Sequence, residues 1–239
     1  MKKALILSAT PEPKSFIAGM AQTSCRVLAE EGYDVTHSDL YAMNWNPVAS
    51  EADFGDRAKD NYLVYALEQR NGVSTQTIAS DIQRELDKLI ACDLLVLNFP
   101  IYWFSVPAIM KGWFDRVIVS GLCYGGVRFY DRGGLTGKRV YVAATLGGQP
   151  HMFGERAVHG PMNTMLSPLL RGTLGYTGME VLDPFMAWHV PYISQEAREG
   201  IMRDYEASLR DLDSRATLEF PSLDDFDKRL NPLNQAESA

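Results

Sequence analysis

Residues 93–119 read DLLVLNFPIYWFSVPAIMKGWFDRVIV and carry the strongest structural signal in the chain. The first six, residues 93–98, form a nearly continuous apolar run, which is typical of a strand buried on both faces of a sheet. Residues 106–119 show apolar positions at helical spacing. A buried strand that is followed by a helix indicates an α/β protein with a parallel sheet.

Similar units lie on both sides of this stretch. The other segments that read as strands are residues 3–8, 34–39, 139–145 and 179–183. The other segments with helical spacing are residues 16–31, 77–91, 161–174 and 194–213, whereas residues 41–72 are irregular, with short helical pieces. Because strands alternate with helices, we predict a doubly wound parallel sheet of about five strands with helices on both faces. Such sheets bind ligands beyond the carboxyl ends of their strands, so the loops after strands one, three and four are candidate sites.

The composition excludes several classes of protein. The chain has 239 residues, of which 30 are acidic and 23 basic, so its net charge is −7. This argues against nucleic acid and anionic membrane surfaces as partners, because both attract clustered Lys and Arg. The longest uncharged stretch, residues 94–110, contains two prolines and is too short to span a bilayer, so we expect no membrane insertion. We expect one domain over residues 1–215 and a polar tail over residues 216–239.

Cysteine spacing and common motifs narrow the chemistry further. Cys25, Cys92 and Cys123 lie far apart and form no C-x-x-C, which indicates reduced thiols in a cytoplasmic protein. The four histidines and these cysteines show no metal-ligand spacing, so we expect no metal site. G-x-G-x-x-G and G-x-S-x-G are both absent, which removes a Rossmann dinucleotide site and an α/β-hydrolase nucleophile.

The loop after the first strand ends where a helix begins. Thr10 and Ser15 supply hydroxyls there, and the helix start supplies free backbone N–H groups at the positive end of its dipole. These are the parts of a phosphate-binding site. Ser15 is equally well explained as the N-cap of the helix, and spacing alone does not separate the two interpretations.

The loop after the third strand places Tyr102, Trp103 and Phe104 between Pro100 and Pro107. Aromatic rings in a rigid loop at a ligand-binding edge offer a stacking surface to a planar ligand. The alternative is a hydrophobic plug or a dimer contact, since aromatic clusters more often belong to cores.

The loop after the fourth strand contains Gly147 and Gly148, whose missing side chains would let a flat ligand approach the backbone. A plain turn is the other explanation. His159 follows at the start of a predicted helix, where it could donate to a developing anion or move a proton near neutral pH. As an isolated histidine, it would more often be structural.

Taken together, these segments resemble the flavodoxin-like NAD(P)H:quinone oxidoreductases of the DT-diaphorase type. The matching segments are residues 3–16, which end in EPKSF, and residues 38–44 (SDLYAMN), 99–114 (FPIYWFSVPAIMKGWF), 145–148 (TLGG) and 159–163 (HGPMN). The resemblance runs over residues 3–184. The long aromatic segment is its most specific part.

The resemblance implies a dimeric enzyme that holds FAD at the carboxyl edge of a flavodoxin-like sheet, and an FMN enzyme of the same fold is the alternative. NADH or NADPH would pass a hydride to flavin N5, and a quinone would then take it in a ping-pong reaction. The implied cofactor-binding residues are Thr10, Ser15, Phe16, Asn61, Pro100, Ile101, Tyr102, Trp103, Phe104, Thr145, Leu146, Gly147, Gly148 and Phe153. The implied catalytic residues are His159, Tyr124, Gly147 and Gly148.

The chain departs from the family pattern at several positions. The tyrosine that pairs with the family's histidine is matched by Phe153, so His159 is expected to work without a hydroxyl partner. A second pocket tyrosine is matched by Gly126, which should widen the substrate site. The metal-site histidines of a shorter relative are matched by Arg171 and Gly175, which agrees with the expectation of no metal.

Two functions therefore stand beside each other. The first is FAD-dependent two-electron reduction of quinones, extending to azo or nitroaromatic compounds. The second is a flavodoxin-like electron carrier or a regulatory subunit of an ion-efflux system. The aromatic residues and His159 favour the enzyme, because they suggest an enclosed substrate pocket, whereas a carrier needs an exposed flavin edge.

Overall fold

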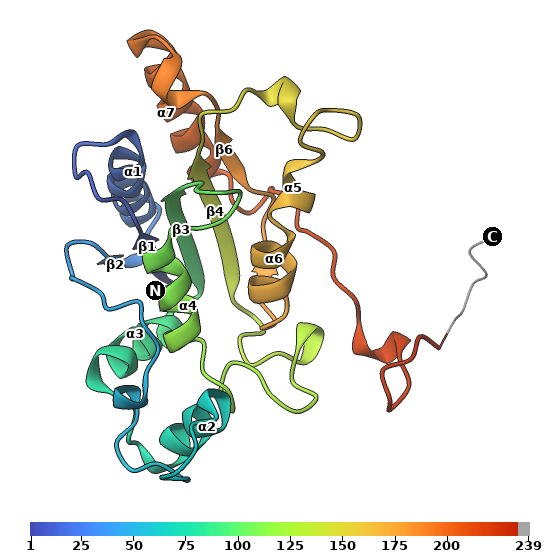
Figure 1. The fold of residues 1–239 in the computed structure, drawn as a ribbon. Coiled ribbons are helices and arrows are strands. Elements are labelled where there is room, and N and C mark those ends of the chain that lie inside the picture. Colours follow the sequence, from blue (N-terminus) through green and yellow to red (C-terminus); the bar gives the residue numbers. More distant parts are fainter. Residues whose placement is uncertain (234–239) are drawn as a thin grey trace.

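The computed structural model describes residues 1–233, which fold around a parallel sheet with helices on both faces (Figure 1). The strands are β1 (Lys3–Ser8), β2 (Asp34–Asp39), β3 (Leu94–Pro100), β4 (Arg139–Thr145), β5 (Glu180–Val181) and β6 (Phe185–Ala187). Five of them lie in the order β2-β1-β3-β4-β5, and β6 also pairs with β4. This is the flavodoxin-like order, so the predicted fold class is confirmed.

The two faces of the sheet are covered by different helices. The α-helices are α1 (Phe16–Glu30), α2 (Tyr65–Thr75), α3 (Ser80–Ala91), α4 (Ala108–Val117), α5 (Met162–Met165), α6 (Ser167–Leu169) and α7 (Gln195–Arg210). Leu5 and Leu7 of β1 pack in one core cluster with residues of α3 and α4. Ala4 and Ile6 of the same strand pack in a second cluster with residues of α1 and α7. Both faces of β1 are therefore buried, which explains its uninterrupted apolar sequence.

A buried polar network joins α1 and α7 to the central strand. The side chains of Ser24, Asn98 and Tyr205 are fully buried. The Ser24 hydroxyl lies 2.6 Å from the Tyr205 hydroxyl, and the Asn98 side-chain amide donates to the same oxygen at 3.0 Å. Because each group has a partner, the network holds α1 in register with the end of β3 without an unpaired polar atom.

The edge strand after β4 was only partly predicted. Residues 179–183 were expected to form a fifth strand, and β5 covers two of them. The strand is interrupted over residues 182–184, and the chain pairs with β4 again as β6, where Ala143, Ala144 and Thr145 pair with Phe185–Ala187. A strand of three residues after a proline has too little sequence pattern to be recognised.

Two helical predictions were also incomplete. Residues 161–174 do not form one helix; they divide into α5, α6 and a π-helical segment, η4 (Leu170–Gly175). Pro168 starts a new helical segment because it lacks the N–H that would continue the previous one. Residues 41–72, expected to be irregular with short helical pieces, contain the 3-10 turn η1 (Glu51–Asp53) and most of α2, which extends beyond them to Thr75.

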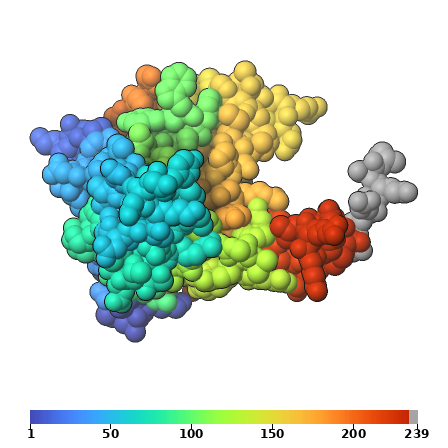
Figure 2. Space-filling view, turned by 60° about the horizontal axis from the view of Figure 1, so that its bottom comes forward, coloured from blue at the N-terminus to red at the C-terminus, as the bar shows by residue number. Residues whose placement is uncertain are grey.

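The segment after α7 returns to the sheet and then crosses to a distant loop. Asp183 N–H donates to Ala216 O at 2.8 Å and Leu218 N–H to Val181 O at 2.8 Å, so the chain covers the edge beside β5. Further on, the Ser222 hydroxyl donates to the Asp131 carboxylate at 2.7 Å. Figure 2 shows this last described part, residues 219–233, projecting beside the loop that precedes β4.

The three cysteines, Cys25, Cys92 and Cys123, are all free thiols. Burial raises the pKa of Cys92 and Cys123 to about 11, so both are unreactive thiols at neutral pH.

Along residues 1–233, every helix falls short of the length and apolar character that a bilayer crossing needs. In the same residues, no group of three or more His, Cys, Asp or Glu side chains could hold a metal ion.

Candidate active site

A groove of about 370 Å³ lies beyond the carboxyl ends of β1, β3, β4 and β6. Its lining residues come from four loops and the start of α1: Thr10, Pro11, Glu12, Ser15, Phe16, Ile17, Pro100, Ile101, Tyr102, Thr145, Leu146, Gly147, Val190 and Pro191. Nine of these fourteen were expected from the sequence. The groove lies where parallel α/β sheets bind their ligands, because helix N-termini and loop backbone meet at this edge.

One end of the groove carries hydroxyls and a helix start. The Thr10 hydroxyl lies 3.0 Å from that of Ser15, whose oxygen also accepts the N–H of Ala18 at 3.2 Å. The structure confirms Ser15 as the N-cap of α1 and also places it in the groove wall. Phe16 and Ile17 are the first two helical residues, and their N–H groups have no carbonyl within the helix. This end is suited to an anionic group such as a phosphate.

The aromatic loop after β3 forms a tight hairpin. Tyr102 and Ser105 exchange two backbone hydrogen bonds of 3.0 Å each. The central residues, Trp103 and Phe104, have φ of 50° and 55°, which is strained for residues with large side chains. Strain of this kind is concentrated at ligand sites. Trp103 is 97% exposed, so its ring lies at the open rim and not in the core.

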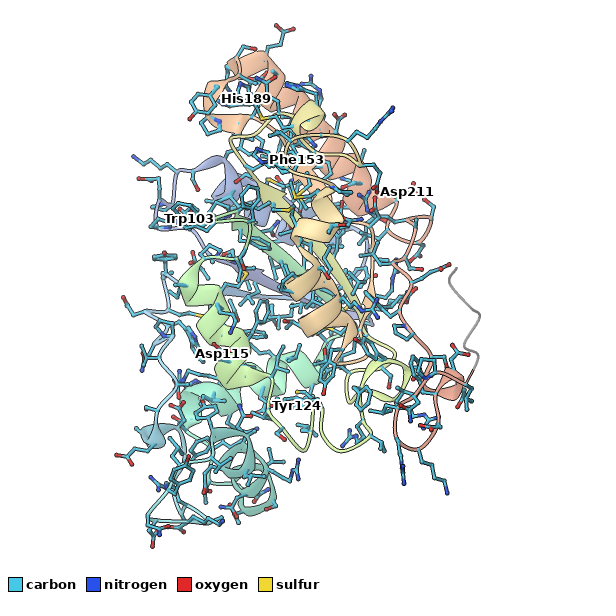
Figure 3. The ribbon with its side chains drawn as sticks, turned by 45° about the vertical axis from the view of Figure 1, so that its right-hand side comes forward. Trp103, Asp115, Tyr124, Phe153, His189 and Asp211 are labelled. Atoms are coloured by element: carbon cyan, nitrogen blue, oxygen red, sulfur yellow. The ribbon has the colours of Figure 1, made fainter. Side chains whose placement is uncertain are left out.

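Four rings gather beside this hairpin. The centroid of the His159 ring lies 5.4 Å from that of Phe104 and 5.0 Å from that of Phe153. Phe153 in turn packs against Trp188 at 5.1 Å and lies close to Gly148, where a Cβ would approach the Phe153 ring to 2.9 Å. Figure 3 places Phe153 and Trp103 at the end of the molecule that also carries His189. The hairpin, the glycine loop and His159 thus form one region.

Tyr124 and Asn61 do not join this region within one chain. Tyr124 lines a second groove of about 220 Å³, together with Lys111, Asp115 and Tyr176. Burial raises the pKa of Tyr124, so its hydroxyl stays protonated at neutral pH. Figure 3 shows Tyr124 well apart from Phe153. Asn61 is exposed in the loop before α2.

The sequence did not single out the residues after β6. Trp188 contacts Phe153, whereas Val190 and Pro191 line the groove. They reach this edge because β6 pairs with β4, so the chain leaves the sheet beside the glycine loop. Recognising β6 would have pointed to them, since the residues after any parallel strand end at the same edge.

Comparisons with known proteins point to one fold and one family. A family model described as "Flavodoxin-like fold" matches residues 2–211. The chain is 38% identical over 210 residues to human ribosyldihydronicotinamide dehydrogenase [quinone], covering 87% of this chain and 91% of that protein. It is 35% identical over 228 residues to rat NAD(P)H dehydrogenase [quinone] 1, covering 95% of this chain and 83% of that protein. A solved Klebsiella pneumoniae protein, assigned as a quinone reductase, superposes with a TM-score of 0.92 at 30% identity, covering 98% of this chain and 94% of that one.

The fold and the groove define a flavodoxin-like oxidoreductase. The chain belongs to the NAD(P)H dehydrogenase (quinone) family, a family of enzymes. The resemblance identified from the aromatic and glycine segments is thereby confirmed.

Proposed function

We propose that this protein catalyses two-electron reduction of quinones by NAD(P)H, using FAD bound in the groove at the carboxyl edge of the sheet. The observation that carries the proposal is the groove itself, in which a hydroxyl-lined helix start, an aromatic hairpin and a glycine loop face one space. Family membership supports the reaction type. Azo and nitroaromatic compounds are further acceptors to test, and the free thiols support a cytoplasmic location.

The residues present suit a flavin cofactor, for which we propose FAD. Thr10, Ser15 and the first amides of α1 would hold its phosphates, because this end combines donors with a positive dipole. The backbone of residues 100–104 would flank the ring system, and Thr145–Gly148 would face its pyrimidine edge. A flavin held there would supply the redox chemistry of hydride transfer from NAD(P)H to the quinone.

The protein's own part is positioning and electrostatics. Backbone N–H groups near Gly147 and Gly148 would stabilise the negative charge that develops on the flavin edge. His159, held between Phe104 and Phe153, would hold or move a proton over the substrate position. Donor and acceptor would use this position in turn, which gives ping-pong kinetics.

The separation of Tyr124 from His159 supports a homodimer, in which Tyr124 of one chain completes the substrate pocket of the other. The test mixes a Tyr124→Ala chain with a His159→Ala chain, after unfolding and refolding them together. Random pairing would restore about a quarter of wild-type activity, because half of the dimers carry one intact site. Absence of restoration, with dimers demonstrably mixed, would exclude this arrangement.

The central experiment identifies the flavin released from the denatured protein by chromatography and follows NAD(P)H oxidation with menadione. FAD with rapid turnover and parallel double-reciprocal plots would support the proposal. FMN with turnover would retain the enzyme and contradict the dinucleotide. Absence of flavin after reconstitution would overturn the proposal.

The high exposure of Trp103 keeps an electron carrier as a second candidate, since the groove is open on that side in one chain. A carrier would bind flavin, yet fail to oxidise NAD(P)H with menadione unless a separate reductase is added.

A further inference from the structure

The glycine loop after β4 is tied to the segment after β6 by three hydrogen bonds at consecutive carbonyls. Val190 N–H donates to Leu146 O at 3.3 Å, and His189 N–H donates to Gly148 O at 3.0 Å. The His189 ring nitrogen Nδ1 lies 2.7 Å from Gly147 O. The carbonyls of residues 146, 147 and 148 therefore all turn toward residues 189–190.

This arrangement sets the direction of three amides. The peptide bonds are trans, and in a trans peptide the C=O and the N–H of one plane point in opposite directions. The N–H groups of Gly147, Gly148 and Gln149 consequently point away from residues 189–190. Over the described residues, none of these three amides donates to a protein acceptor. Successive free N–H groups on one side of a loop form a site for negative charge.

The protonation of His189 follows from its partners. A carbonyl oxygen only accepts, so Nδ1 must carry the proton that is shared with Gly147 O. The side-chain amide nitrogen of Gln149 lies 3.5 Å from Nε2. The ring also packs against Tyr192, with centroids 4.9 Å apart. The backbone of His189 has φ of 57°, a conformation that few side chains tolerate and that is retained here beside the groove.

We propose that His189 is a positioning residue for the reaction: its Nδ1–H holds the glycine loop so that the three free amides face the negative charge of the reduced flavin. This rests on the proposed function. His189 does not contact the reacting atoms in this scheme; it acts through the Gly147 carbonyl. Its loss would therefore weaken binding of the reduced flavin more than binding of the oxidised flavin, and so lower the flavin midpoint potential.

The test compares three variants by the midpoint potential of the bound flavin. His189→Gly removes the ring and relieves the positive φ. His189→Asn keeps an N–H donor near the Nδ1 position and also tolerates that φ. His189→Gln carries its donor at the Nε2 position and cannot reach Gly147 O from the same backbone.

We expect the Gly and Gln variants to lose about tenfold in relative affinity for the reduced flavin, a shift of about −30 mV for a two-electron couple. The Asn variant should stay near the wild-type potential. An unchanged midpoint potential in His189→Gly would overturn the role of His189, and so would a potential in His189→Asn as low as that in His189→Gly. Either result would leave the proposed function intact. If one loss variant fails to fold, the other still decides. Wild-type protein that binds no flavin would overturn both this inference and the proposed function.

Discussion

The Thr10 hydroxyl lies 3.0 Å from the Ser15 hydroxyl, across the turn that joins β1 to α1. The pair brings two donors to the start of a helix whose first amides are free, at one end of the groove. Capping of the helix and the proposed phosphate binding thus involve the same oxygen, and a matched pair of variants can separate the two roles.

Ser15→Ala should reduce both stability and flavin affinity, whereas Ser194→Ala should reduce stability alone. Ser194 caps α7 as Ser15 caps α1, each accepting an N–H at 3.2 Å, but it does not line the groove. Each variant should lose about 1 kcal/mol of unfolding free energy. Ser15→Ala should also weaken flavin binding about tenfold, because a hydrogen bond to a charged group is lost. Urea denaturation of apoprotein and fluorescence titration with FAD measure the two effects; equal flavin affinity in both variants would contradict the phosphate assignment.

Gly148→Ala should be more damaging than Gly147→Ala. A Cβ at Gly148 would lie 2.9 Å from the Phe153 ring, whereas a Cβ at Gly147 meets nothing nearer than Tyr192 at 3.4 Å. The first change must displace Phe153 and with it the ring that packs on His159, and we expect turnover to fall about tenfold from misplacement. Steady-state kinetics with menadione compares the two, and near-UV circular dichroism reports the displaced ring. A larger loss in Gly147→Ala would show that Phe153 is not what limits this position.

Phe153→Tyr should raise turnover. The Phe153 and His159 rings are 5.0 Å apart, so a hydroxyl on the first can give the histidine a hydrogen-bonding partner. We expect a gain of about tenfold in kcat, less than a full general acid–base contribution, because His159 is already present. The gain should vanish in a His159→Gln background if the two residues act together. An equal gain in kcat in the wild-type and His159→Gln backgrounds would show that the added hydroxyl does not act through His159.

Asp53→Asn should destabilise the protein at neutral pH and lose its effect in acid. Asp53 is buried, and its carboxylate accepts from Arg116 at 2.8 Å and from the Tyr65 hydroxyl at 2.5 Å. Burial alone would raise the pKa of Asp53, but the hydrogen bonds from Arg116, Tyr65 and Ser50 outweigh it and leave the pKa below its usual value.

A carboxyl whose folded-state pKa is lowered stabilises the fold above the unfolded-state pKa of about 3.9, and this stability is lost as the pH falls through the folded-state value. We expect Asp53→Asn to lower the free energy of unfolding by about 3 kcal/mol at pH 7. The difference between the variant and the wild type should decrease below about pH 4. Guanidinium denaturation at several pH values measures it. Asp213→Asn is the control, since its ion pair with Arg139 is exposed and should contribute little. A difference between wild type and Asp53→Asn that stays constant into strong acid would contradict the assignment.

Much of the fold could be predicted from the sequence, because the patterns that indicate strands and helices are local. β1, β2 and β4 have the predicted bounds, and α1 and α7 begin within one residue of the predicted starts. Buried strands need continuous apolar runs, and helices need apolar positions at their own spacing, so each segment reports its own environment. The candidate groove was also largely predictable, because parallel strands end at one edge whatever the details of their packing.

Other features depend on contacts between segments that are distant in the chain. β6 has only three residues, and its pairing with β4 brings His189 to the glycine loop, although about forty residues separate them. No local sequence pattern indicates a role for His189, because its partner is a backbone carbonyl, which any residue could supply. Tyr124 and His159 were assigned to one pocket by resemblance, yet one chain keeps them apart. Local pattern indicates which residues are buried, whereas pairing between distant segments determines which of them meet.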